Sequence, residues 1–582
     1  MTSVGEGSRD LLVVALSGVQ QFISESRSTV DLGASSAIMS ELAVTAADAL
    51  RRSGVELIFP APGAPRSSAP NRIVGLAGAG QGPAAAAGAA AAVIARWQGW
   101  VRQIHQGAVG TPGMPSVQWV VAPPLDATGR PVAYGDQWRA GQSELAARKR
   151  INDFPLVQAT NVQLCSLSPR WPAVAAPSGL RDYEKDTLSA ANWVKRRWNR
   201  LNPPAEGAAE ESRFSSTAAI ATASYRQRII DRLDVDRDLA GQVAALRAAA
   251  GEPGRRLERP VAGLRWNRSE ELHTWVARGA GSWLYTSAWD PGRLERDHPG
   301  TPWSTAAATA GSQACKAIAK ALTGTFPSGP PAYLAVVTQD VDDMGRLLSG
   351  TGREQEVNAV WHTRISQTLA AAAAEQRRVL DSAELLTSVV YAGGDDLFAL
   401  APAATALTAA RVGRTTVPEE LGTASSAVLF FHYRSSLQRA VVAARRLLED
   451  AKSFTARKDA LGVGFLRRSG AAETSVHPWD LRGTPASDLF ASFGSPAVRS
   501  FSPRAIGDLS RDERELADLD ASDPDLYRAE IGRLIGRHLR ERGDPGGVLN
   551  TLLSLTGGVA GVRHAAMIKA MTVGQFIGQE CR

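Results

Sequence analysis

SVVYAGGDDLFAL, residues 388–400, is the stretch that decides the fold of this 582-residue chain. The apolar runs Leu385–Tyr391 and Leu397–Leu400 predict two strands joined by a tight turn, and the two glycines permit the positive φ values that such a turn needs. Asp395 and Asp396 would then lie at its tip, where neighbouring carboxylates repel unless they share a cation. Alone, the motif is equally typical of a metal site and of a solvated hairpin turn.

A second acidic segment follows another apolar run. Tyr333–Thr338 predicts a strand, and it leads into Gln339-Asp340-Val341-Asp342-Asp343. In a ferredoxin-like sheet the first strand lies beside the hairpin strands, so Asp340 would come close to Asp395. A lone Asp-x-Asp at a strand end is usually surface. Two acidic clusters in this order favour an oxygen-ligand site for Mg²⁺ or Mn²⁺.

The surrounding pattern predicts the rest of a palm-like domain. The expected elements, in chain order, are a strand at 333–338, a helix at 354–380, the hairpin, a strand at 425–432, a helix at 437–452 and a strand at 460–466. Strands and helices in this order are typical of a ferredoxin-like fold.

An earlier block repeats the alternation without the acidic residues. Expected strands at 11–16, 55–59, 73–76 and 117–122 surround a helix at 83–103. Ser17-Gly18 follows the first strand where the later domain has aspartates, so we expect a degenerate palm. We hypothesise a composite nucleotide pocket between the two sheets; unchanged ATP turnover after substitutions on the facing surface of the first would count against it.

The remaining segments favour helices. Residues 231–250 predict one charged helix, and the basic-aromatic run 196–200 is more typical of a solvated helix face than of a nucleic-acid contact. We therefore expect an α+β chain with four parts: a degenerate ferredoxin-like palm (1–160), a mainly helical middle domain (161–330), an active ferredoxin-like palm (331–485) and a C-terminal helical bundle (486–582).

Bulk properties narrow the class of protein. The chain lacks a run of 18 apolar residues and an N-terminal signal pattern, and its three cysteines cannot form a disulfide framework. A cytoplasmic protein without membrane contact is therefore expected. The net charge of +7 mildly favours a polyanionic partner.

The palm motifs resemble a known family. Residues 333–345 and 389–400 resemble the palm of nucleotide cyclases and polymerases, and the Asp-Asp ending is similar to the large subunit of type III CRISPR effectors. Segments 16–23, 55–60 and 70–72 resemble the Cmr branch (type III-B) of that family. The resemblance touches most of the chain, but only the palm motifs are specific.

The resemblance implies an activity and its residues. ATP would be joined into short, often cyclic oligoadenylates when CRISPR RNA pairs with target RNA inside a complex with small helical and backbone subunits. Two metal ions, Mg²⁺ or Mn²⁺, would be held by Asp340, Asp395 and Asp396 with the Val341 carbonyl. The residues expected to meet the nucleotide are Gly393, Gly394 and Lys452.

Two departures from the family limit these expectations. The chain has no His-Asp dipeptide, so no HD nuclease is expected. Cys165 lacks the partner cysteines that a zinc site needs, so we expect no zinc and a small buried residue at this position. Two alternatives stay open: an RNA-binding scaffold subunit with a silent palm, and a free-standing nucleotide cyclase of the GGDEF class. The wider resemblance disfavours the latter.

Overall fold

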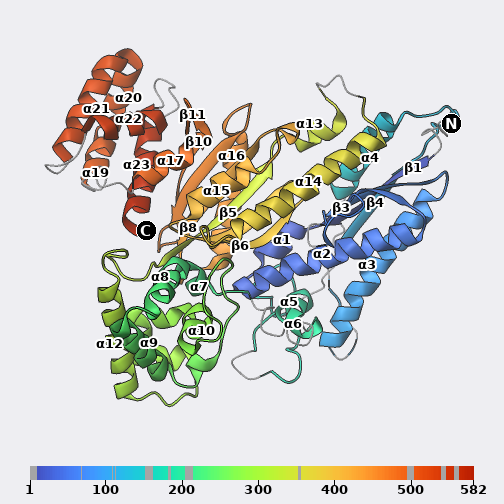
Figure 1. Ribbon diagram of the computed structural model, residues 1–582. Helices are drawn as coiled ribbons and strands as arrows, with labels where there is room; N and C mark the ends of the chain where they lie inside the picture. The colour runs from blue at the N-terminus through green and yellow to red at the C-terminus, as the bar shows by residue number, and fades with distance from the viewer. Residues whose placement is uncertain are drawn as a thin grey trace.

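The computed structural model describes residues 9–581, except 67–68, 106, 108, 112, 151–161, 181–184, 203–213, 352–355, 494–503, 539–544 and 556–562. Two sheet domains lie side by side, with helices of the middle region below them and the C-terminal helices beyond the second sheet (Figure 1). The predicted α+β class with two ferredoxin-like sheets is confirmed. The predicted domain boundary at 160/161 lies outside the described residues.

The first sheet has the strand order β2-β3-β1-β4 and is antiparallel throughout, as in a ferredoxin-like fold. Its strands are β1 (Arg9–Ser17), β2 (Glu56–Phe59), β3 (Arg72–Gly78) and β4 (Ser116–Ala122). Both faces of β1 are buried, because Leu12 and Val14 pack against one set of helices and Leu11 and Val13 against another. The first set is α2 (Thr29–Arg52) and α3 (Gly82–Ile104), and the second includes α4 (Tyr134–Arg150).

The second sheet contains the quoted hairpin. Its order is β10-β9-β8-β5-β7-β6. The strands are β5 (Tyr333–Val341), β6 (Ser388–Gly393), β7 (Asp396–Pro402), β8 (Ala424–His432), β9 (Ala460–Leu466) and β10 (Ala472–Pro478). Strands β8-β5-β7-β6 form a ferredoxin-like core, and β9 adds a parallel neighbour to β8.

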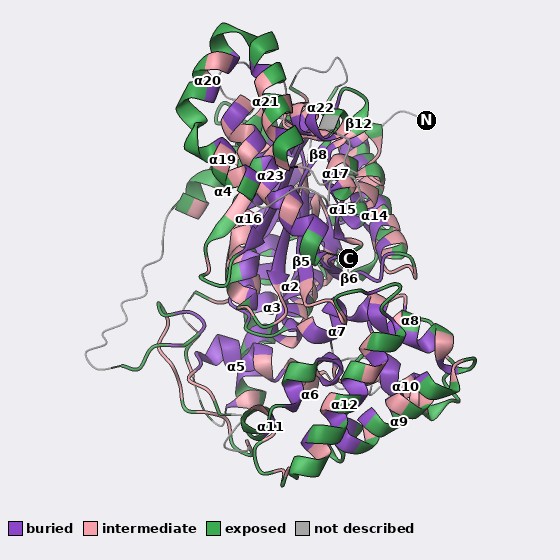
Figure 2. Cartoon of the chain, turned by 90° about the vertical axis from the view of Figure 1, so that its left-hand side faces the viewer, coloured by how far each residue is buried: buried purple, intermediate pink, exposed green. Residues whose placement is uncertain are grey.

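Helices cover both faces of this sheet because its central strands alternate between two cores. Ala335 and Val337 face the cluster with α14 (Ala359–Leu380) and α15 (Ala406–Thr415), whereas Leu334 and Val336 face α16 (Leu437–Phe454). In Figure 2 these strands are purple, the colour of buried residues. Trp361 and Ile365 of α14 also pack against the first sheet, so the two domains share a core.

Two predicted helices differ in their ends. The helix expected from Glu354 begins at Ala359, because the Asn358 side chain accepts a hydrogen bond from the Trp361 N–H (2.9 Å) and caps the helix there. The single helix expected over 231–250 is two, α8 (Ala223–Leu233) and α9 (Arg237–Ala250). Asp236 separates them, because its carboxylate caps α9 by accepting from the Leu239 N–H (2.9 Å).

The middle region consists of short helices that are linked to both sheet domains. They are α5 (Ala190–Arg196), α6 (Trp198–Leu201), α7 (Thr217–Ala221), α8, α9, α10 (Glu271–Arg278), α11 (Pro291–Asp297) and α12 (Thr305–Ala321). The prediction of a solvated face at 196–200 is wrong: Arg196 forms two hydrogen bonds to the buried Asp31 (2.8 and 3.1 Å). Trp198 packs edge-on against Trp100, with 4.9 Å between ring centroids. Cys165 is buried, as expected.

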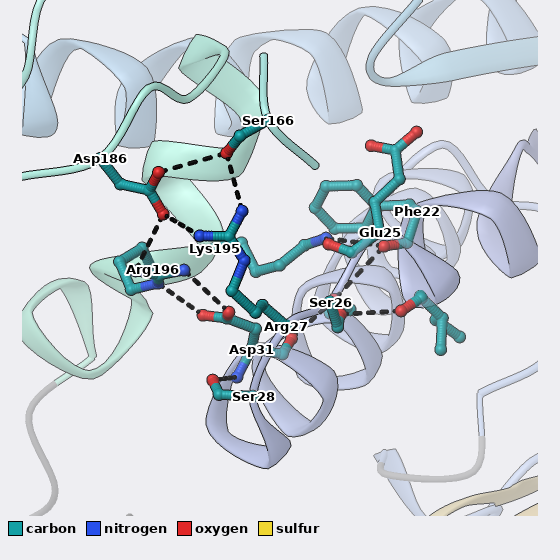
Figure 3. Close-up of polar contacts among 12 residues, drawn as sticks. Phe22, Glu25, Ser26, Arg27, Ser28, Asp31, Ser166, Asp186, Lys195 and Arg196 are labelled. Atoms are coloured by element: carbon teal, nitrogen blue, oxygen red, sulfur yellow. Dashed lines mark hydrogen bonds and ion pairs between the residues drawn. The ribbon is translucent and has the colours of Figure 1, made fainter. Parts of the chain in front are cut away.

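Lys195 is the centre of the contact between α5 and the first sheet domain (Figure 3). Its fully buried ammonium donates to the carbonyls of Phe22 (2.7 Å) and Glu25 (2.6 Å) in helix α1 (Val19–Ser24) and the residue after it. Burial lowers the pKa of Lys195 to about 7, although the negative charges of Glu25 and Asp31 act to raise it. The lysine thus fixes the end of α1.

We expect the variant Lys195→Met to unfold at a lower temperature than the wild type. Its free energy of unfolding should be lower by about 2–4 kcal/mol. Methionine fills a similar volume, but the two carbonyls lose their donor inside the protein. Thermal unfolding followed by circular dichroism measures this, with Lys320→Met on the exposed surface of α12 as control. Equal midpoints for the two variants would contradict the role given to Lys195.

The C-terminal helices pack on the far end of the second sheet. They are α17 (Ala486–Ser492), α19 (Arg504–Arg511), α20 (Glu513–Ser522), α21 (Pro524–His538), α22 (Pro545–Leu555) and α23 (Arg563–Glu580). Phe576 of α23 stacks on Phe465 of β9, with 4.1 Å between ring centroids. In the part of the chain that the structure describes, no helix combines the length and apolar character needed to cross a membrane.

Candidate active site between the two sheet domains

The β5–β7 register brings the two acidic segments together. Asp340 lies directly opposite Asp396, and the next pair along β5 is Gln339 with Leu397. The turn is fixed to the end of β5, because the Val341 N–H donates to the Asp395 carbonyl (3.0 Å). Strand pairing, rather than sequence proximity, therefore places Asp340, Asp395 and Asp396 at one edge of the sheet.

Of the two glycines, only Gly394 has the left-handed conformation, with φ +62°. Gly393 pairs with Asp396 at the end of the hairpin and has ordinary strand geometry, so of the two glycines the turn uses a positive φ at Gly394. A Cβ on Gly394 would come 3.9 Å from the Pro70 side chain. The turn thus lies against the loop that precedes β3 of the first sheet.

The carboxylates are held in an environment that disfavours their charge. Burial, followed by the charge of Asp395, raises the pKa of Asp340 to about 6. Burial and the charges of Asp395 and Asp340 raise the pKa of Asp396 well above its ordinary value, and a hydrogen bond between the Asp340 and Asp396 carboxyl groups adds to the shift. The pair therefore favours a shared proton, or a cation in its place.

Lys452 is the cation that contacts this pair. Its Nζ lies 3.1 Å from Asp340 Oδ2, near the end of α16. Burial alone would lower the pKa of Lys452, but the charges of Asp340, Glu449 and Asp396 and the hydrogen bond to Asp340 together raise it. Lys452 pairs with Asp340, and the Arg445 guanidinium adds a second positive charge near Asp396. The expectation that Lys452 lies near the nucleotide site stays a prediction.

The neighbouring aspartates have other partners. Asp342 is buried and accepts hydrogen bonds from Thr423 Oγ1 (2.9 Å), Ser425 Oγ (2.8 Å) and the Asp459 N–H (3.0 Å). Asp343 forms an ion pair with Lys458 (2.9 Å). Both are therefore anchors for the loop before β9, and Asp340 is the β5 aspartate that remains opposite the hairpin.

Oxygen ligands of this kind fit Mg²⁺ or Mn²⁺. Within the described ranges, no three His, Cys, Asp or Glu side chains are already gathered as a metal-binding group. The facing pair Asp340 and Asp396 would supply two ligands, and the adjacent Asp395 and the Val341 carbonyl are the further oxygens predicted from the sequence. The raised pKa values agree with this fit, because a divalent cation would offset both the burial and the repulsion that raise them.

A cavity of about 90 Å³ lies directly against the carboxylates. One wall belongs to the second sheet domain and includes Asp340, Asp396, Arg445 and Glu449, and the other belongs to the first. The residues of the first domain that line it are Val19, Gln20, Ile23, Ser36, Met39, Ala69 and Asn71. The hypothesised pocket between the two sheets thus has a counterpart in the structure.

Two hydrogen bonds join the walls of this cavity. Ser36 of α2 donates to the Val390 carbonyl of β6 (2.9 Å), and the Arg445 guanidinium donates to the Gln20 side-chain oxygen. Ligand pockets for nucleotide-sized molecules usually measure about 300–1,000 Å³, so the walls must separate to admit one. Sequence patterns did not assign Arg445, Glu449 or Ser36 to the site. Gln20 and Asn71 lie in the segments 16–23 and 70–72, which resemble the Cmr branch, but the sequence did not predict that they line the site.

Comparison with known proteins agrees with this arrangement. Residues 333–462 match the family model Cas10/Cmr2, second palm domain, and residues 11–99 match CRISPR-associated protein Cmr2, N-terminal. The CRISPR system Cmr subunit Cmr2 of Pyrococcus furiosus is 30% identical over 181 residues, which are 26% of this chain and 20% of the relative. The match therefore spans a fifth of that relative's length.

Solved structures share the fold over a longer stretch. The type III-B Cmr-beta structure in its apo state covers 92% of this chain and 78% of its own, with a TM-score of 0.59 and 13% identity. The Cmr-beta structure bound to cognate target RNA covers 92% and 79%, with a TM-score of 0.61 and 13% identity. Two segments of the chain are thus similar to domains of Cas10/Cmr2 proteins, residues 11–99 to the N-terminal domain and residues 333–462 to the second palm domain.

Proposed function

We propose that this chain is a metal-dependent nucleotidyltransferase that joins ATP molecules into short oligoadenylates, cyclic or linear. The observation that carries the proposal is the facing pair Asp340 and Asp396, with raised pKa values, in the lining of a cavity between the two sheet domains. An ordinary solvated hairpin turn has no need for a second carboxylate in register across the neighbouring strand.

In the proposed reaction, the 3′-hydroxyl of one ATP attacks the α-phosphorus of another. A phosphodiester bond forms, the bond between the α- and β-phosphates breaks, pyrophosphate leaves, and the hydroxyl proton is lost to solvent. Divalent cations bound by Asp340, Asp395, Asp396 and the Val341 carbonyl would activate the hydroxyl and neutralise the leaving group. Lys452 would exchange its contact with Asp340 for the triphosphate oxygens, and Gly393 and Gly394 would let the backbone approach the nucleotide.

The first sheet domain would supply the second wall of the nucleotide site. Gln20 and Asn71 line the cavity, and their side-chain amides are groups that can bind ribose or base edges. Because the cavity is small, nucleotide entry requires the Ser36–Val390 and Gln20–Arg445 contacts to open. A step that moves the two sheet domains apart would thus control the activity.

The biological setting is proposed from the similarity to Cas10/Cmr2 domains. We propose that the chain is the large subunit of a cytoplasmic type III CRISPR antiviral effector complex, in which pairing of CRISPR RNA with target RNA triggers synthesis. Its partners would be these two RNAs and the small helical and backbone subunits of the complex. The two family-model matches support this setting, as does the target RNA in one similar structure.

The proposal is tested by incubating the assembled complex with ATP and Mg²⁺ or Mn²⁺, with and without target RNA, and identifying products by mass spectrometry. We expect the wild type to form oligoadenylates only when target RNA is present. If both walls of the cavity bind nucleotide, the variant Gln20→Ala/Asn71→Ala should form oligoadenylates about tenfold or more slowly. Parallel reactions with GTP and S-adenosylmethionine test substrate choice. A product from GTP alone would favour a cyclase of the GGDEF class, and no product under any condition would favour a silent scaffold.

A further inference from the structure

A second cavity lies at the opposite end of the same sheet from Asp340. Its volume is about 680 Å³, within the range of ligand-binding sites. His432 at the end of β8 pairs with Tyr333 at the start of β5, and Asp340 lies seven residues further along β5, a separation of about 23 Å. This cavity is therefore distinct from the candidate active site.

Three separate segments form the cavity. The turn between β8 and α16 supplies His432–Ser436, the turn between β9 and β10 supplies Leu466–Arg468 and Gly470, and the middle region supplies Tyr285 and Ser287. Ala332 and Arg439 complete the lining. Residues more than a hundred positions apart thus converge, and one local turn does not explain the hollow.

The charge of the lining is entirely positive. Four of its residues are arginines (Arg434, Arg439, Arg467 and Arg468), and none is an aspartate or glutamate. Arg467 pairs with Glu473 outside the cavity (2.8 Å). The other three form no ion pair with any residue that the structure describes, and all four are exposed. Surface arginines elsewhere on the chain commonly pair with acids one helical turn away, for example Arg378 with Glu375.

The base of the cavity is a rigid aromatic stack. Tyr433 lies nearly parallel to Tyr285, with 4.3 Å between ring centroids, and His432 stacks beside Tyr433 at 4.8 Å. The Arg434 guanidinium lies 5.5 Å from the Tyr433 ring. The Tyr285 hydroxyl donates to the Pro331 carbonyl (2.6 Å), and Thr217 Oγ1 donates to the Tyr433 carbonyl (2.9 Å). These contacts keep the arginines on a preformed support at the joint between the middle region and the second sheet.

We propose that this arginine pocket binds the sugar–phosphate backbone of single-stranded RNA. A guanidinium group binds two phosphate oxygens at once in a planar geometry. Several arginines around one cavity therefore fit a ligand with successive phosphates better than a ligand with a single carboxylate. The inference rests on the proposed function for the identity of the RNA, which would be a strand of the guide or target, but not for the chemistry of the pocket.

The test uses the full chain and a fluorescein-labelled single-stranded RNA of twelve uridines, with binding followed by fluorescence anisotropy at several salt concentrations. Each phosphate contact to a single strand contributes about −0.7 to the slope of log K against log salt. The triple variant Arg434→Ala/Arg439→Ala/Arg468→Ala should therefore flatten the slope by about 2 and weaken binding at least tenfold at low salt.

A matched control removes the same charge elsewhere. Arg52→Ala/Arg102→Ala/Arg237→Ala deletes three exposed arginines from α2, α3 and α9 and should keep the wild-type slope. Equal slopes for the two triple variants, each with a wild-type unfolding midpoint, would overturn the proposal. The variant Arg434→Lys/Arg439→Lys/Arg468→Lys should keep most of the slope, because it keeps the charge.

Two competitors identify the ligand class. Displacement of the RNA by millimolar ATP, lost in the pocket variant, would make the pocket a mononucleotide site and overturn the RNA assignment. Equal competition by poly-glutamate would mean that the pocket binds any polyanion, which would also overturn it. Asp395→Ala/Asp396→Ala should bind the RNA like the wild type, so failure of the proposed enzyme activity and failure of this pocket are distinguishable.

Discussion

Replacement of Asp396 by asparagine is expected to raise the melting temperature of the metal-free protein while it removes nearly all ATP turnover. The carboxyl group of Asp396 is buried beside Asp340 and Asp395, and its pKa is raised well above the ordinary value. At neutral pH its ionised form therefore costs folding free energy. Asparagine has almost the same shape without the charge, so the cost disappears.

The size of both effects can be bounded. The neighbouring Asp340 has its pKa raised from 3.8 to about 6, and a shift of about 2 units corresponds to roughly 3 kcal/mol. We expect Asp396→Asn to gain about 1–3 kcal/mol in metal-free buffer. We expect turnover to fall about 1000-fold or more, because a neutral amide is a poor ligand for a divalent cation and no longer balances its charge.

Asp342→Asn provides the matched control for stability. Asp342 belongs to the same acidic segment, but its carboxylate accepts three hydrogen bonds from the protein, and an amide group cannot replace all of them. It should lower the melting temperature in differential scanning fluorimetry, in the opposite direction to Asp396→Asn. If both variants were destabilised alike, Asp396 would be a structural acceptor and not a carboxylate held for a cation.

The second large effect is a pH dependence of stabilisation by metal. In metal-free protein, Asp340 has a raised pKa, so between about pH 4 and 6 the folded state holds protons that the unfolded state has lost. The contribution of this group to stability is present below that window and is lost as pH rises through it. A bound cation needs the ionised carboxylates, so metal affinity changes in the opposite sense.

Millimolar Mn²⁺ should therefore raise the melting temperature by several degrees at pH 7.5 and by almost nothing at pH 5. A cation at 100 times its dissociation constant stabilises the folded state by about 2.7 kcal/mol. Scanning fluorimetry across this pH range measures the effect, and Asp395→Ala/Asp396→Ala should show no metal-dependent shift at either pH. A shift of equal size at both pH values, or one that persists in the double variant, would place the metal elsewhere.

Local sequence patterns predicted much of the fold. The apolar runs at 385–391 and 397–400 and the glycine turn specify the hairpin, and the run at 333–338 specifies β5, because strand period and turn chemistry are short-range properties. Ferredoxin-like order then predicted that Asp340 faces the turn that carries Asp395, and the β5–β7 register pairs Asp340 with Asp396, the next residue of that turn. The separation of α8 from α9 at Asp236 was missed because a capping aspartate looks like any other charged residue of a helix.

The parts of the site that could not be predicted depend on contacts between distant segments. Arg445 and Gln20 are 425 positions apart and meet only because the two sheet domains share a core. The prediction of a solvated helix face at 196–200 was wrong for the same reason, because Asp31, the partner of Arg196, lies 165 positions away. Likewise, Arg434 and Arg468 line one pocket only because the turn between β8 and α16 and the turn between β9 and β10 converge in the fold.

The most direct test of the central claim compares three forms of the assembled complex: wild type, Asp395→Ala/Asp396→Ala and, as a surface control, Glu375→Ala, whose exposed ion pair contributes little. Each is given ATP, Mn²⁺ and target RNA, and adenylate products are quantified by mass spectrometry. We predict oligoadenylates from the wild type and the control and none from the double variant. Equal product from all three forms would contradict the assignment of Asp395 and Asp396 to the chemistry.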